Sequence, residues 1–138
     1  MLGEAPDARL VLIVECDPHV RDLQCFFLER EAFRVEYADD GPTALERART
    51  VLPAVVVTEI LLPGLDGLAL CRQLRDDPVT RGIPVVVFSM LAAAARAADA
   101  GARAFLRKPL VETTFLAAVH DAIATQPTGI MEQQWQPR

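Results

Sequence analysis

Charged or hydroxyl side chains follow four short apolar runs of the sequence, close to the point where each run ends. Glu15-Cys16-Asp17 follows LVLIV, Glu59 follows VVVT, Ser89 follows VVVF, and Lys108 comes shortly after AFL. A carboxylate at the end of a buried strand is costly to desolvate unless something there uses or compensates its charge. These residue types suggest an ion pair, in which Glu59 stays ionised because Lys108 lies opposite it.

Composition singles out Lys108 among the basic residues. The chain has 14 lysines and arginines, and Lys108 is the only lysine among them; Pro109 follows it directly. The ammonium group of lysine is a compact, strongly hydrated point charge on a flexible stem, so it does not replace the planar guanidinium group of arginine chemically. We therefore interpret Lys108 as a candidate for a specific role.

Hydrophobic periodicity predicts five strand–helix units that would position these groups. Continuous apolar runs favour strands covered on both faces, and apolar residues at helical spacing favour amphipathic helices. Asp17-Pro18 and Asp40-Gly41-Pro42 are typical helix starts. The predicted strands are Leu10–Val14, Arg34–Ala38, Ala54–Thr58, Val85–Phe88 and Ala104–Leu106, and the predicted helices are about His19–Glu31, a segment opened by Gly41, Gly67–Arg75, a short one within Leu91–Ala100, and Val111–Ala124.

The alternation of strands and helices predicts an α/β fold with a parallel sheet and helices on both faces. Right-handed crossovers limit the topology to a few options. In such sheets, sites lie outside the carboxyl ends of the strands, near the point where the strand order switches. This rule brings Glu15-Cys16-Asp17, Glu59, Ser89 and Lys108 to one edge of the sheet.

Length and charge set limits on the function. The 138 residues suit one core domain, residues 9–124, with an N-terminal extension, residues 1–8, and a C-terminal tail, residues 125–138. We expect the tail to be flexible, although Ile130, Met131 and Trp135 could pack on the domain. The net charge of −5 argues against a generic nucleic-acid-binding surface.

Localisation follows from what the sequence lacks. No apolar run approaches the ~20 residues that a membrane helix needs, and the first residues do not form the pattern of a secretion signal. The three cysteines, Cys16, Cys25 and Cys71, are an odd number without C-x-x-C spacing. We interpret them as reduced thiols of a cytoplasmic protein that binds neither membrane nor nucleic acid.

Five stretches of the sequence together carry a resemblance to a known family. They are LIVECDPHVR, EYADDGPTAL, VVVTEILLPGLDG, IPVVVFSM and GARAFLRKP, in this order. From Leu10 to Ala124 the chain resembles the receiver domain of two-component response regulators. The resemblance implies a flavodoxin-like, doubly wound (βα)5 three-layer sandwich with strand order 2-1-3-4-5. It also implies a signalling module that is not an enzyme, and the loops lack the glycine motifs of nucleotide-binding or hydrolase folds.

In that family, an acidic pair after strand one holds magnesium, and an aspartate after strand three accepts a phosphoryl group from a histidine kinase. A hydroxyl residue and a lysine bind the phosphate, and an aromatic residue on strand five changes its packing. The resemblance assigns the hydroxyl position to Ser89, the lysine position to Lys108 and the aromatic position to Phe105. Lys108-Pro109 resembles the family's Lys-Pro step, which is usually cis.

Glu15 and Cys16 stand where the resemblance would place the acidic pair. Magnesium prefers oxygen ligands in near-octahedral geometry at about 2.0–2.1 Å, and a soft sulfur is a poor ligand for it. We therefore predict no resident cofactor. Were Mg²⁺ to bind, its protein ligands would come from Glu15, Asp17 and Glu59.

Glu59 stands where the phosphoacceptor aspartate would be. Its extra methylene moves the carboxylate outward by about 1.5 Å, and a misplacement of ~1 Å can cost in-line transfer ~100-fold. The same displacement would let Glu59 reach Ser89 and Lys108 without modification and partly mimic the phosphorylated state. The alternative is an inert Glu59–Lys108 salt bridge, with Ser89 as a strand-end cap and Phe105 as plain core.

Our favoured hypothesis is a stand-alone, atypical receiver that acts as a phosphorylation-independent protein-interaction module. The alternative is a conventional phosphorelay receiver, as such or as a fragment of a longer response regulator. The expected partners are a histidine kinase, a downstream signalling protein, or a second copy in a homodimer. The segment from Ser89 to Gly101 is about one helical turn shorter than is usual in the family, which would alter the signalling and dimer surface.

Overall fold

The computed structural model describes residues 9–124, so the predictions for the N-terminal extension and the C-terminal tail lie outside the described residues, Ile130, Met131 and Trp135 included. Within residues 9–124, strands and helices alternate strictly along the chain, beginning with a strand and ending with a helix. This is the alternation that the hydrophobic periodicity predicts.

The strands form one parallel sheet in the order β2-β1-β3-β4-β5, which confirms the predicted doubly wound, flavodoxin-like topology. Every residue of β3 and β4 is buried, whereas the edge strands β2 and β5 are partly exposed. The apolar runs therefore belong to strands that are covered on both faces. The strands are β1 (Leu10–Val14), β2 (Arg34–Ala38), β3 (Val55–Thr58), β4 (Val85–Ser89) and β5 (Ala104–Arg107).

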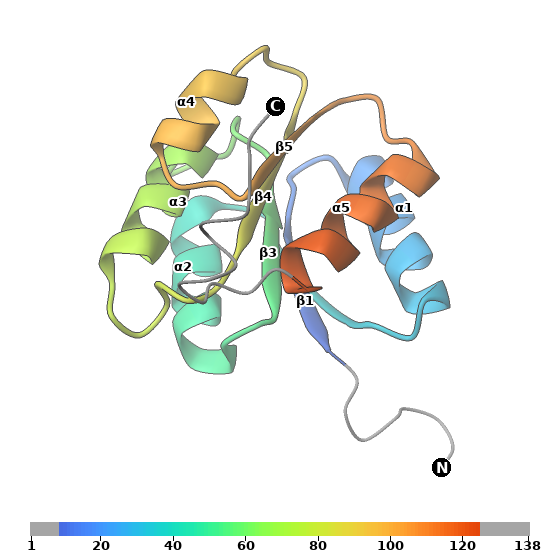
Figure 1. The fold of residues 1–138 in the computed structure, drawn as a ribbon, viewed down its shortest axis with the longest axis horizontal. Helices are drawn as coiled ribbons and strands as arrows, with labels where there is room; N and C mark the ends of the chain where they lie inside the picture. The colour runs from blue at the N-terminus through green and yellow to red at the C-terminus, as the bar shows by residue number, and fades with distance from the viewer. Residues whose placement is uncertain (1–8, 125–138) are drawn as a thin grey trace.

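Helices cover both faces of the sheet and close two separate apolar cores. Figure 1 shows α1 and α5 on one face and α2, α3 and α4 on the other. Because side chains alternate along a strand, Leu12 and Val14 of β1 face the α2–α3–α4 core, and Val11 and Ile13 face the α1–α5 core. The helices are α1 (Pro18–Arg30), α2 (Gly41–Val51), α3 (Gly67–Asp76), α4 (Ala94–Asp99) and α5 (Glu112–Ala124).

Aspartates begin three of these helices directly beside the carboxyl ends of the strands. Asp17, Asp40 and Asp66 each accept at least one backbone N–H from the first turn of α1, α2 and α3. Gly67 opens α3, and a Cβ at this position would collide with the carbonyl oxygen of Glu59. A glycine is therefore required for the first turn of α3 to pack against the residue that follows β3.

Two element boundaries differ from the prediction in a way that matters for the site. Ser89 and Arg107 are the last residues of β4 and β5 and pair with each other in register, although both were predicted to follow the strands. The N–H of Lys108 then donates to the carbonyl of Ser89 at 2.9 Å. The apolar pattern of a strand does not include polar residues at its end. Such residues are therefore assigned to a strand only when its pairing with the neighbouring strand is known. The fourth helix has only six residues, within the predicted range.

Candidate functional site

Three charged side chains from distant parts of the sequence meet at the carboxyl edge of the sheet. Glu15 follows β1, Glu59 follows β3 and Lys108 follows β5. In the sheet, β5 lies two positions away from β3. The carboxylates are almost fully buried, at 2% and 4% exposure, and the lysine side chain is 17% exposed. The prediction that Glu59 and Lys108 lie opposite each other agrees with this geometry.

Glu59 is held on both of its oxygens. Oε1 accepts the backbone N–H groups of Ile60 at 2.6 Å and of Leu61 at 3.2 Å. Oε2 lies 3.2 Å from Nζ of Lys108. Hydrogen bonds from backbone N–H groups and an adjacent cation both favour the charged form of a carboxylate. The extra methylene of glutamate therefore lets the side chain fold back onto its own backbone while still reaching the ammonium group.

Glu15 is the second carboxylate that binds Lys108, and sequence reasoning missed this pair. Nζ of Lys108 lies 3.1 Å from Oε1 and donates to Oε2 at 3.2 Å, and the N–H of Asp17 donates to the same Oε2 at 3.2 Å. Oε1 is buried and makes no hydrogen bond of good geometry, so the ion pair alone compensates it. The available signal was the position of Glu15 directly after β1, the neighbour of β3 in the sheet.

Burial and neighbouring charges shift the pKa values of Glu15 and Lys108. Burial raises the pKa of Glu15 above its ordinary value of 4.5, and the charge of Glu59 adds to this, while the N–H of Asp17 and the ammonium of Lys108 only partly oppose it. For Lys108, burial alone would lower the pKa, but the hydrogen bonds and charges of Glu15 and then Glu59 raise it above 10.5. The cluster therefore keeps its ammonium charged at neutral pH.

The remaining two residues of the Glu15-Cys16-Asp17 stretch point elsewhere. The thiol of Cys16 is exposed and donates to the carbonyl oxygen of Leu61 at 3.7 Å. Asp17 is exposed, and its Oδ1 caps α1 by accepting the N–H of His19 at 2.9 Å. Neither side chain joins the two buried carboxylates at the ammonium group.

Cys16, Cys25 and Cys71 are free thiols in the structure. Burial raises the pKa of the Cys25 thiol and of the Cys71 thiol to about 11 each. A thiol with so high a pKa carries almost no thiolate at neutral pH, so these two are structural side chains.

The donor set at the edge of the sheet does not fit a magnesium ion as it is arranged. Within residues 9–124, no group of three or more His, Cys, Asp or Glu side chains is placed to hold a metal. The one oxygen without a hydrogen bond, Oε1 of Glu15, is covered from solvent and faces the ammonium of Lys108 at 3.1 Å. A divalent cation at that oxygen would meet a like charge, and Cys16 offers sulfur where an oxygen is preferred.

Ser89 lies at the same edge but takes no part in the charge cluster. It is fully buried, and its Oγ accepts the N–H of Leu91 at 3.2 Å, which is a local turn contact. Among the described residues, no hydrogen bond joins it to Glu59, so of the two partners expected for Glu59 only Lys108 is reached. The reason is that the amides of Ile60 and Leu61 already hold the other oxygen of Glu59.

Phe105 and the Lys108-Pro109 step lie where the resemblance would place them. Phe105 is half-buried on β5 and packs against the α2–α3–α4 core. The Lys108-Pro109 peptide bond is cis, as expected. The ring of Phe88 lies 5.5 Å from Nζ of Lys108 and closes the apolar side of the cluster.

Comparison with known proteins shows the same architecture. Residues 11–120 match the family model described as "Response regulator receiver domain". The chain is 37% identical over 115 residues to "Response regulator PleD" of Caulobacter vibrioides, covering 81% of this chain and 25% of PleD. It is 35% identical over 119 residues to "Transcriptional regulatory protein CseB" of Streptomyces coelicolor, covering 82% of this chain and 48% of CseB. The chain thus spans less than half of each of these relatives.

Solved structures agree with the sequence matches. A putative response regulator from Chloroflexus aurantiacus superposes with a TM-score of 0.82 at 28% identity, covering 86% of this chain and 99% of that one. The signal receiver domain of a histidine kinase from Syntrophus aciditrophicus superposes with a TM-score of 0.79 at 28% identity, covering 85% of this chain and 91% of that one.

Within residues 9–124, no helix has the length and apolar character needed to cross a membrane.

Proposed function

Because this chain belongs to the response regulator receiver domain family, we propose that it is an atypical receiver that signals by protein interaction without being phosphorylated. In this proposal Glu59 stands permanently in place of the phosphoacceptor aspartate. Receiver domains are signalling modules of two-component systems rather than enzymes, and they act through histidine kinases and downstream proteins. The partner of this chain would then be a protein of one of these two kinds.

The observation that carries the proposal is the double ion pair of Lys108. Its ammonium group lies within 3.2 Å of carboxylate oxygens from both Glu15 and Glu59. A phosphoryl group bound at this edge would need the same ammonium as its counter-charge, and it would add nearly two negative charges to a cluster that already has a net charge of −1. The protein thus satisfies its site internally.

The metal site supports the same conclusion. Phosphoryl transfer to a carboxylate requires a cation to offset the repulsion between two anions. Here Cys16 supplies sulfur, Asp17 caps a helix, and the buried carboxylates face an ammonium group. We infer that Lys108 performs internally, and permanently, the charge compensation that a bound cation would otherwise supply.

A conventional phosphoreceiver is the competing function. Glu59 follows β3, Ser89 ends β4 and Lys108 follows β5, so all three lie at one edge of the sheet. This is the arrangement that the family resemblance assigns to phosphate binding. The two relatives are a response regulator and a transcriptional regulatory protein, and this chain covers 25% and 48% of their lengths. On this reading the chain would be the input part of a longer regulator.

Intact-mass spectrometry after incubation with acetyl phosphate and Mg²⁺ separates the two functions. We expect no mass gain for the native protein. The double variant Cys16→Asp/Glu59→Asp is the matched positive control, because it supplies an oxygen donor at position 16 and the shorter carboxylate at position 59 and changes no residue of the two apolar cores. We expect it to gain one phosphoryl group.

The variant Glu59→Gln decides where any phosphate on the native protein is attached. A stable gain of one phosphoryl group by the native chain that disappears in Glu59→Gln would overturn the proposal and establish the conventional function. If neither the native chain nor the double variant gains mass, the substitutions at positions 16 and 59 do not explain the inactivity, and the proposal in its present form fails.

A further inference from the structure

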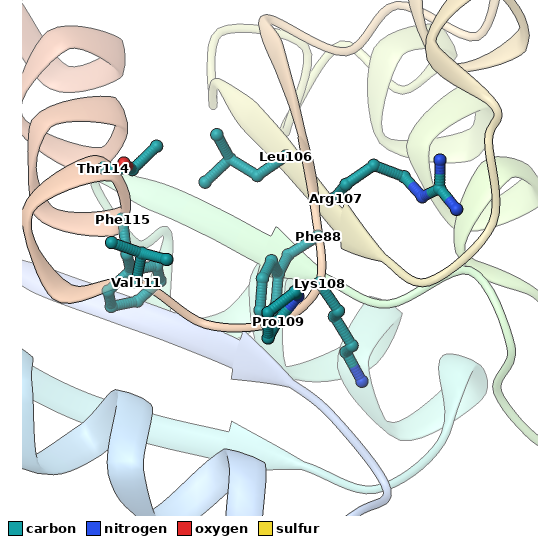
Figure 2. A pocket seen from close by; sticks show the side chains of 8 residues that line it. All are labelled: Phe88, Leu106, Arg107, Lys108, Pro109, Val111, Thr114 and Phe115. Atoms are coloured by element: carbon teal, nitrogen blue, oxygen red, sulfur yellow. The ribbon is translucent and has the colours of Figure 1, made fainter.

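A mainly apolar groove that the charge cluster does not use lies between β5 and the first turns of α5. It has a volume of about 330 Å³, and its main lining residues are Phe88, Leu106, Pro109, Val111, Thr114 and Phe115. Figure 2 shows the side chains of Leu106 and Thr114 facing the same space from β5 and α5, with Phe88 and Phe115 deeper. We call this hollow the α5 groove.

The two basic residues that also line the α5 groove turn their charges away from it. Figure 2 shows the ends of the Arg107 and Lys108 side chains directed away from the other lining residues. Arg107 donates through Nε to the carbonyl of Met90 at 3.0 Å, and the Lys108 ammonium is bound by the two buried carboxylates. The groove therefore presents an apolar surface with one hydroxyl, that of Thr114.

The α5 groove is exposed rather than sealed. Val111 is 52% exposed, and Leu106 is only half-buried. The groove lies next to β5, which ends the sheet and has no further strand beside it among the described residues. An exposed apolar hollow at an open sheet edge is a typical docking place for an apolar side chain. Its volume lies at the lower limit of the ~300–1,000 Å³ of small-molecule pockets and suits a single large side chain.

We propose that the α5 groove binds Trp135 of the chain's own segment 125–138. This segment lies outside the described residues, and its sequence, TQPTGIMEQQWQPR, contains the only tryptophan of the chain. An indole buries ~150–250 Å² and combines a large apolar ring with one N–H donor. Both match a groove with an aromatic floor, formed by Phe88 and Phe115, and a single hydroxyl acceptor on its wall.

The length of the chain permits this return. The α5 helix begins at Glu112 beside the groove and ends at Ala124, so the segment must come back over at most about 18 Å of helix. Trp135 is 11 residues beyond Ala124, and an extended chain of that length reaches ~36 Å. Because the segment is tethered, its effective concentration at the groove is in the millimolar range, ahead of a separate partner at cellular concentration.

The inference is independent of the phosphorylation state argued above. It concerns the covering of an apolar surface, and it holds equally if the chain continues beyond Arg138. Its consequence is that residues 125–138 would mask the outer side of the segment that carries Lys108, so a partner that uses this surface must first displace the chain's own tryptophan.

Fluorescence of the single tryptophan tests the inference in the full 138-residue protein. We expect native Trp135 to emit at shorter wavelength than the free peptide 125–138 and to be quenched several-fold less by acrylamide. Val111→Glu and Thr114→Lys place a charge in the groove at exposed positions, so the fold should survive. Both should shift the emission and the quenching towards the values of the peptide.

Val79→Glu is the matched control, because Val79 is an equally exposed valine, at 55%, in the turn between α3 and β4. It should leave Trp135 unchanged, and circular dichroism should show all variants folded. The inference is overturned if native Trp135 is as accessible as in the peptide. It is also overturned if Trp135 is shielded but insensitive to Val111→Glu and Thr114→Lys, or if shielding grows with protein concentration, which would indicate a second copy.

Discussion

The buried cluster of Glu15, Glu59 and Lys108 and the surface contact between His120 of α5 and Glu31, which directly follows α1, have almost the same N–O distances but very different consequences. At the sheet edge, Lys108 lies 3.1–3.2 Å from carboxylates that are 2% and 4% exposed. Between the helices, the Glu31–His120 contact is also 3.1 Å, but its side chains are 42% and 53% exposed. Water already compensates the exposed pair, whereas the buried cluster has only its own members and the backbone amides of Asp17, Ile60 and Leu61.

The difference shows that burial, and not distance, decides what an ion pair does for this fold. Exposed pairs contribute about 0–1 kcal/mol. A buried cluster need not stabilise the protein relative to an apolar core, but the loss of its ammonium group leaves two buried carboxylates without a counter-charge. The cluster therefore determines the charge balance of the site, whereas the contact between Glu31 and His120 affects only the protein surface.

Lys108→Met should have the largest effect on stability. The substitution keeps an unbranched side chain but leaves Glu15 and Glu59 buried together without a counter-charge, and we expect a loss of about 3 kcal/mol in the free energy of unfolding. Urea denaturation at neutral pH measures it. The triple variant Lys108→Met/Glu15→Gln/Glu59→Gln should recover most of the loss, because no unpaired charge remains.

Arg107→Met is the matched control for this comparison. Arg107 is the adjacent basic residue, exposed and bonded to one carbonyl, so its loss should cost less than about 1 kcal/mol. If Lys108→Met proves no more destabilising than Arg107→Met, the two carboxylates are compensated by something other than the ammonium group, and the description of the cluster is wrong.

The pH dependence of stability should reveal Glu15 specifically. Its pKa is raised in the folded state, so its protonated form stabilises the fold below the ordinary value of 4.5, and this contribution is lost as the pH rises through the raised value. Glu15→Gln should remove that loss. The unfolding free energy of the native protein should therefore fall relative to that of Glu15→Gln as the pH rises across the acidic range.

Thermal unfolding of both proteins between pH 4 and pH 8 measures this difference, and Glu31→Gln serves as the control for a carboxylate outside the cluster. Lys108 contributes at the other end of the scale, because its pKa is raised and its contribution is lost only as the pH rises above 10.5. A native-minus-Glu15→Gln difference that is flat between pH 4 and pH 8 would contradict the assigned shift.

Removal of the exposed contact between Glu31 and His120 should have the smallest effect on stability. Glu31→Gln removes an exposed contact to His120, and we expect a change below about 0.5 kcal/mol in the free energy of unfolding. Urea denaturation at neutral pH checks it. A loss comparable to that of Lys108→Met would remove the distinction between the two regions.

Sequence reasoning reached the architecture because each strand and helix carries its own local signal. The buried valines of β3 and β4, the aspartates that begin the helices and the alternation of elements fix the topology through the rule of right-handed crossovers. The same topology brought Glu59 and Lys108 to one edge before any coordinates. These inferences need only periodicity and chain order.

The finer geometry depends on side-chain choices that no periodicity records. Glu15 was placed at the correct edge, but its pairing with Lys108 depends on how a long flexible ammonium distributes itself between two carboxylates. Glu59 was expected to reach Ser89 as well; instead its carboxylate accepts the amides of Ile60 and Leu61. The α5 groove depends on residues of three elements and has no signature in the sequence.

Backbone NMR of the native protein with Mg²⁺ and beryllofluoride, a mimic of the phosphoryl group, is the most direct test of the internally satisfied site. The amides of Ile60 and Leu61 report on Glu59, and the amide of Lys108 reports on the cluster. We predict that these resonances do not move, whereas those of Cys16→Asp/Glu59→Asp shift on addition of both reagents. Saturable shifts at the same amides of the native protein would contradict the account.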